Sequence, residues 1–186
     1  MPTDTDAPIT PANLVRQPGG DTFVSRAVTI DRSRDELYAF WRNFSNLARL
    51  MDNVERIEVL DERRSHWVVK GPAGADIEWD SLVVEDEPGR RIAWRADEDA
   101  EIRNSGWVEF RDAPPGRGTE VHAVIEYDAP GGVVGRLIAK LFQREPNTQT
   151  RRELRRFKQL METGEISTSE GPRGAGRHEP SESKES

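Results

Sequence analysis

The chain has 186 residues, a formal net charge of −7 and no cysteine. The length suits one domain with tails, and the lack of cysteine excludes disulfides, thiolate metal sites and a cysteine nucleophile. The acidic balance argues against nucleic acid as a partner, because the phosphate backbone favours basic surfaces.

Polar residues are concentrated at the two ends of the chain. Residues 1–21 and 165–186 contain little that could pack, so we expect a disordered leader and a disordered tail around a domain spanning 22–164. The start lacks the basic and apolar segments of a signal peptide. No stretch approaches the ~20 apolar residues of a membrane span. These features predict a cytoplasmic protein without stable membrane insertion.

The domain opens with a predicted strand and two short helices. Apolar residues alternate toward the end of Thr22–Ile30, as in a strand with one buried face. Ser33 stands three residues before Glu36, the spacing of a capping box at a helix start. A second short helix is predicted over Ser45–Met51.

Six further strands are predicted between turns rich in glycine and proline. The first, Val54–Leu60, alternates with a slip that indicates a bulge or a late start. The others are centred on 66–69, 77–83, 92–94, 106–110 and 121–127. Short connections predict antiparallel pairing between consecutive strands.

A long C-terminal helix is predicted to cover the sheet. Helical spacing runs over Val134–Phe142, Pro146 predicts a kink or a short break, and Gly164 is a natural stop. A curved sheet around one helix is not filled completely by side chains, so this arrangement predicts a cavity for an apolar ligand.

The order of elements and several segments resemble a known family. The segments are His66–Gly74, Glu78–Asp80, Arg91–Arg95, Arg117–Val121 and Arg155–Leu160. Together they are similar to bacterial polyketide cyclase/dehydrase proteins of the START/Bet v 1-like (SRPBCC) superfamily, which includes coenzyme Q-binding START-domain proteins. The resemblance implies an α+β helix-grip fold, in which a seven-stranded antiparallel sheet wraps around the C-terminal helix. It implies a ligand tunnel between the two, and it carries over no catalytic set.

The candidate ligand-binding residues are aromatic and aliphatic side chains that the patterns place on the inner face. Among the five tryptophans, Trp67 and Trp79 rank first, because they lie on middle strands with apolar residues of the same parity; ordinary core packing is the alternative for each one. The predicted cavity lining is Phe40, Trp67, Val69, Ile77, Trp79, Trp94, Val108, Phe110, Ile125, Tyr127, Leu137, Leu141 and Phe157.

No catalytic or metal-binding constellation is visible, and no cofactor is predicted. His66 and His122 lie far apart, without the clustered partners that catalysis or zinc binding needs. Glu78 and Asp80 share one face of a strand and are interpreted as solvated charge, with a coupled catalytic pair as the alternative.

Two functions follow from the sequence. The first is a binding or carrier protein for a small hydrophobic molecule such as a lipid, a quinone or a polyketide-like compound. The alternative is a cyclase or dehydratase whose polar groups are Arg95, Ser81 and Tyr127. A third hypothesis is a stress-related or regulatory interaction module that uses the charged tail. The apolar residues after Gly131-Gly132 predict a helix face packed on the sheet, or a gate that touches a membrane transiently.

Overall fold

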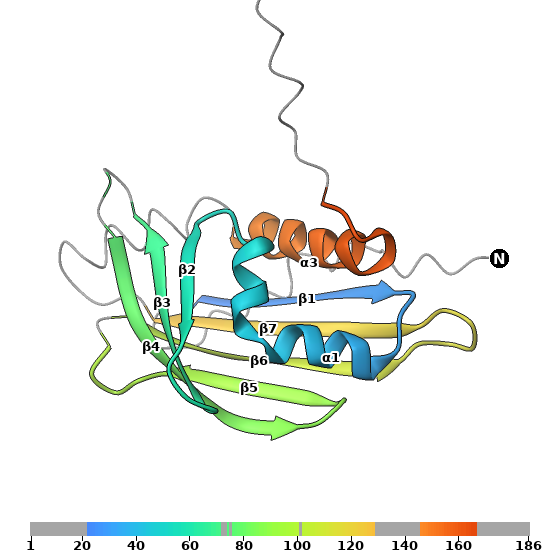
Figure 1. Ribbon diagram of the computed structural model, residues 1–186, viewed down its shortest axis with the longest axis horizontal. Coiled ribbons are helices and arrows are strands. Elements are labelled where there is room, and N and C mark those ends of the chain that lie inside the picture. Colours follow the sequence, from blue (N-terminus) through green and yellow to red (C-terminus); the bar gives the residue numbers. More distant parts are fainter. Residues whose placement is uncertain (1–21, 72–73, 75, 101, 129–145, 167–186) are drawn as a thin grey trace, which may run out of the picture.

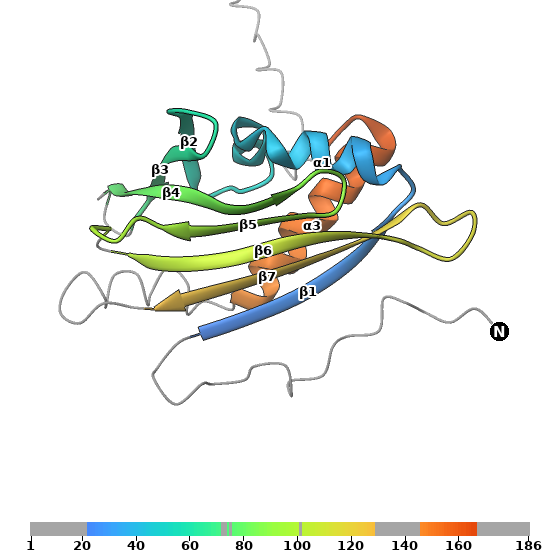
Figure 2. The same cartoon turned by 90° about the horizontal axis from the view of Figure 1, so that it is seen from below.

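The computed structural model describes residues 22–71, 74, 76–100, 102–128 and 146–166. A curled sheet carries the helices on its concave side (Figures 1 and 2). Its elements are β1 (Thr22–Ile30), α1 (Arg34–Arg42), the 3₁₀ helix η2 (Phe44–Arg49), β2 (Val54–Val59), β3 (Arg64–Lys70), β4 (Asp76–Glu87), β5 (Arg91–Ala96), β6 (Arg103–Asp112), β7 (Thr119–Asp128) and α3 (Pro146–Thr163).

The seven strands form one antiparallel sheet in the order β1-β7-β6-β5-β4-β3-β2, which confirms the predicted fold class. Register shifts interrupt the ladder between Val54 and Arg56 in β2 and between Val83 and Glu85 in β4. The first is the slip that the sequence predicted. Bulges of this kind bend a strand and increase its twist, so these two shifts fit the curl of the sheet at the β2–β4 end.

The segment between β1 and β2 folds as the sequence indicates. The Ser33 hydroxyl accepts the backbone N–H of Glu36, and the Glu36 carboxylate accepts the backbone N–H of Ser33, so the predicted capping box is present. The second short helix begins at Phe44 and is a 3₁₀ helix. Leu37 and Trp41 are the buried side chains of α1.

Helix α3 packs its apolar stripe into the sheet. Leu154, Phe157 and Leu160 are buried, and the Phe157 ring lies 5.3 Å from the rings of both Phe40 and Trp41. Full burial of a phenylalanine contributes about 2–3 kcal/mol, so Phe157 fixes α3 against α1.

The C-terminal end of α3 follows from backbone chemistry. Gly164 follows the last turn with φ of 80°, and its N–H donates to the Leu160 carbonyl at 2.8 Å. The helix predicted over 134–142 lies outside the described residues, as do the predicted leader and all but the first two residues of the predicted tail.

The core is tight at one end of the sheet and gives way to a cavity at the other. Val121, at the start of β7, is fully buried beside Phe110 and Val108. Further along β7, Ile125 and Tyr127 face open space instead. Within the described ranges, no helix is long and apolar enough to cross a membrane.

Candidate ligand-binding cavity

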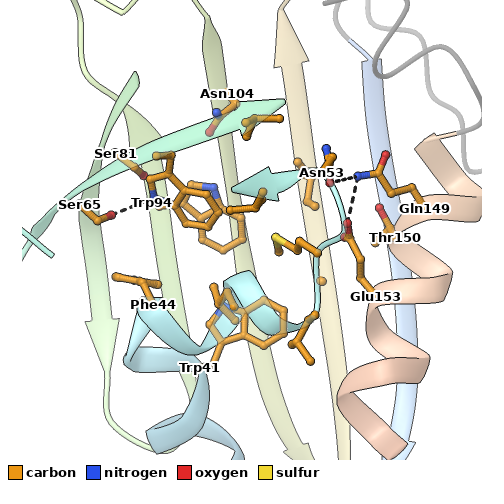
Figure 3. A pocket seen from close by; sticks show the side chains of 18 of the residues that line it. Trp41, Phe44, Asn53, Ser65, Ser81, Trp94, Asn104, Gln149, Thr150 and Glu153 are labelled. Atoms are coloured by element: carbon orange, nitrogen blue, oxygen red, sulfur yellow. Dashed lines mark hydrogen bonds between the residues drawn. The ribbon is translucent and has the colours of Figure 1, made fainter. Parts of the chain in front are cut away.

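A cavity lies between the sheet, the η2–β2 connection and the first turns of α3 (Figure 3). The space open to the centre of a water-sized sphere is about 100 Å³. Most of its wall is apolar, and six of the lining residues are aromatic: Trp41, Phe44, Trp67, Trp79, Trp94 and Tyr127. Aromatic faces at this density suit a flat apolar ligand.

Two of the tryptophans form a stacked pair on neighbouring strands. Trp67 of β3 lies directly opposite Trp79 of β4 in the ladder. Their ring centroids are 5.9 Å apart and their planes differ by 15°. The indole N–H of Trp67 donates a hydrogen bond to the hydroxyl of Ser65 at 3.0 Å, so this polar group is satisfied within the protein and needs no partner from a ligand.

A glycine sets the position of a third tryptophan. Trp94 of β5 pairs with Gly106 of β6. A Cβ atom added at Gly106 would meet the Trp94 ring carbon Cζ2 at 2.7 Å and would also clash with the carbonyl of Val124. Because Gly106 has no side chain, the Trp94 ring can pack directly against the backbone of β6.

The helix side of the cavity is polar. The Gln149 amide nitrogen donates to the side-chain oxygen of Asn53 at 3.0 Å and to Oε1 of Glu153 at 3.0 Å (Figure 3). Gln149 and Glu153 stand one helical turn apart on α3, so the same face of the helix presents both. Thr150 completes this polar end.

The Glu153 carboxyl is tuned by its surroundings. Burial raises the pKa of Glu153 from 4.5 to about 7, and the negative charge of Asp52 adds to the rise. The hydrogen bond from Gln149 and the positive charges of Arg156 and Arg152 lower the pKa and offset the rise only in part. A carboxyl with a pKa near neutrality can give or take a proton at physiological pH.

Tyr127 faces the same space from β7. Burial raises the pKa of its phenol, and the negative charge of Glu153 raises it further, so Tyr127 stays neutral. Ser81 and Asn104 add a hydroxyl and an amide on the sheet side of the wall.

The structure brings part of the predicted lining together. Trp67, Val69, Trp79, Trp94, Ile125 and Tyr127 all line the cavity. Leu137 and Leu141 lie outside the described residues.

Five predicted residues are not among those that line this cavity. Val108, Phe110 and Phe157 share the inner face but lie at the tight end, where they are at most 1% exposed. Phe40 is partly buried and packs on Phe157. Ile77 lies opposite Val69 in the ladder and is partly exposed. A residue on the inner face of the sheet therefore lines the cavity only if it also lies at the open end of the sheet.

The predicted polar and titratable groups separate in the same way. Ser81 and Tyr127 line the cavity, whereas Arg95 is half-exposed and lies 3.6 Å from Glu98. Arg95 follows Trp94 in the strand and so points to the opposite face.

His66 and His122 also lie outside the cavity. Nδ1 of His66 is 2.7 Å from Asp80 and its Nε2 is 3.4 Å from Glu78, on the outer face of the sheet. Nε2 of His122 is 2.7 Å from the Ser25 hydroxyl. Within the described ranges, no three His, Cys, Asp or Glu side chains gather as metal ligands.

The polar end of the cavity was not anticipated from the sequence. Asn53 sits in the connection before β2, and Gln149 and Glu153 lie 96 and 100 positions later. The only signal available was the i, i+4 pair of polar residues beside Leu154 on a helix whose next turns are apolar.

Known proteins share this fold and, in one comparison, much of the sequence. A solved structure from Deinococcus radiodurans is 43% identical, with a TM-score of 0.63 over 77% of this chain and 99% of that one. An uncharacterised 17.2 kDa protein of Streptomyces lincolnensis is 31% identical over 67% of this chain and 79% of its own length.

More distant structures agree in fold alone. The Zhui aromatase/cyclase from Streptomyces sp. R1128 is 18% identical, with a TM-score of 0.59 over 79% of this chain and 99% of that one. A family model described as polyketide cyclase / dehydrase and lipid transport matches residues 22–162. The chain therefore belongs to the polyketide cyclase / dehydrase and lipid transport family, with the START-like fold that its sequence predicted.

Proposed function

We propose that this protein binds a small, flat and largely apolar molecule in the cavity and acts as a binding or carrier protein. The observation that carries the proposal is the cavity wall itself, which combines six aromatic side chains with one polar end. Apolar pockets with a few convergent polar groups are the usual form of small-molecule sites.

The size of the cavity favours a compact ligand. Its volume of about 100 Å³ compares with about 150 Å³ for an engineered apolar cavity that binds one benzene molecule. The enclosed space therefore fits about one ring, and a second ring of a flat ligand would extend toward the mouth. The stacked pair of Trp67 and Trp79 supplies flat surfaces that such rings can contact.

Two measurements test the proposal. Native mass spectrometry of freshly purified protein, followed by solvent extraction, identifies any co-purifying molecule. Isothermal titration with 2-methoxynaphthalene, an apolar two-ring probe, measures binding directly. Trp67→Leu is expected to weaken this binding by about fivefold, since an aromatic pair contributes about 1 kcal/mol beyond the buried area.

The matched control is Trp107→Leu. Trp107 lies on the outer face, edge-on to His122 at 5.0 Å and beneath the Arg91 guanidinium at 4.4 Å. This variant removes the same surface area without touching the cavity and is expected to leave the affinity unchanged. Absence of binding in the wild type, together with a clean apo mass, would refute a ligand-binding role.

A second candidate is an enzyme of the cyclase or dehydratase type that uses the same cavity. The observation that favours it is Glu153, whose pKa is raised to about 7 beside the neutral phenol of Tyr127. Such a pair could transfer protons to and from a reacting chain. Turnover of an aromatic polyketide precursor that is lost in both Glu153→Gln and Tyr127→Phe, but kept in Arg95→Ala, would support it.

A further inference from the structure

Glu153 is the only charged residue among the described residues that line the cavity. Its carboxylate is held from one side, because Oε1 accepts a hydrogen bond from Gln149 at 3.0 Å. The second oxygen, Oε2, accepts no hydrogen bond from any side chain or backbone group in the described ranges.

The neighbouring groups orient this carboxylate and do not neutralise it. Both N–H groups of the Gln149 amide are used, one by Asn53 and one by Glu153. Within the described ranges no cation lies within 4.0 Å of Glu153; Arg156 and Arg152 pair with Asp52 instead.

A cavity end with one open carboxylate oxygen discriminates between ligands by their polar group. A hydroxyl group can donate to the open oxygen of Glu153, and a bond to a charged acceptor is worth more than a neutral one. A ligand carboxylate would meet a like charge with no basic residue in the described wall to compensate.

We propose that Glu153 is the specificity-determining residue of the cavity, which selects a neutral, flat ligand bearing a hydroxyl group and rejects a carboxylic acid. Because this inference rests on the proposed binding function, its test must separate the two. The ligand class is then hydroxylated one- or two-ring compounds, and free fatty acids are excluded by charge as well as by size.

The test uses three probes that share one ring system. Affinities for 2-naphthol, 2-methoxynaphthalene and 2-naphthoate are measured by isothermal titration at pH 8, in wild type and in Glu153→Gln. The control is Glu126→Gln, which makes the same chemical change at an exposed position on β7, one residue before Tyr127 and on the opposite face.

Wild type and Glu126→Gln are expected to bind 2-naphthol about tenfold more tightly than the ether, and 2-naphthoate about tenfold more weakly. In Glu153→Gln the three affinities are expected to fall within about threefold of one another. Equal affinities in wild type, or an unchanged pattern in Glu153→Gln, would overturn the role of Glu153 and leave the binding function standing. Failure of all three probes to bind wild type would remove both.

Discussion

The raised pKa of Glu153 makes the stability of the fold depend on pH, and Glu153→Gln is the perturbation that isolates this effect. The folded state keeps the Glu153 proton up to a pH of about 7, whereas the unfolded chain loses it near 4.5. Between these values the folded state binds more protons, so stability falls as pH rises. The full difference corresponds to about 3 kcal/mol, at about 1.4 kcal/mol for each pKa unit.

Urea unfolding at pH 5, 6, 7 and 8, followed by tryptophan fluorescence, measures the effect. Glutamine is neutral at every pH, so the variant is expected to be more stable than wild type by about 3 kcal/mol at pH 8 and by less than about 1 kcal/mol at pH 5. Burial, with help from the charge of Arg111, lowers the pKa of His122, so the free energy of unfolding falls as the pH drops below 6.5. This pH dependence runs opposite to that of Glu153. It is the same in both proteins and cancels in the difference between them. A difference that stays constant from pH 5 to pH 8 would refute the reasoning.

Three further outcomes are expected. Thermal melting should show that Gly118→Ala destabilises the fold far more than Gly116→Ala. Both glycines have positive φ, but only at Gly118 would an added Cβ clash with the backbone at the end of β1. Gly106→Ala should lower stability and weaken binding of 2-methoxynaphthalene, because its Cβ would meet both the Val124 carbonyl and the Trp94 ring; a similar affinity would contradict the role given to this glycine. Binding of 2-naphthoate should strengthen as the pH falls from 8 to 6, when Glu153 becomes neutral, and a flat profile would count against the carboxyl as the source of its exclusion.

Local patterns predicted the described elements and six of the residues that line the cavity. The Ser33–Glu36 spacing predicted a capping box that is present, because a cap needs only residues within one turn. The parity of Trp67 and Trp79 placed both on the same face, and the antiparallel register then stacks them. Parity also separates Arg95 from Trp94, so its place outside the cavity was already implied by the strand.

The sequence could not predict where along the sheet an inward-facing residue lies, or which distant segments are in contact. Val108 and Phe110 have the same parity as the cavity residues, yet α1 covers them, with Tyr38 packing edge-on against Phe110 at 6.2 Å. The contact between Asn53 and Gln149 depends on where α3 crosses the sheet. That crossing is fixed by packing of Phe157 on Phe40 and by no local rule.

The pairing of β1 with β7 also has a consequence for how the chain folds. Strands β2 to β6 each pair with the next strand in sequence, so the strands from β2 to β7 can form as successive hairpins. Strand β1 instead waits for a partner about 100 residues later, since Val24 pairs with Ile125. On a ribosome, β1 is made long before β7, so the hydrogen-bonding edge of β1 stays unpaired until β7 has been synthesised. Closing this seam brings together segments about 100 residues apart at a cost in chain entropy, and it also places β1 against α3.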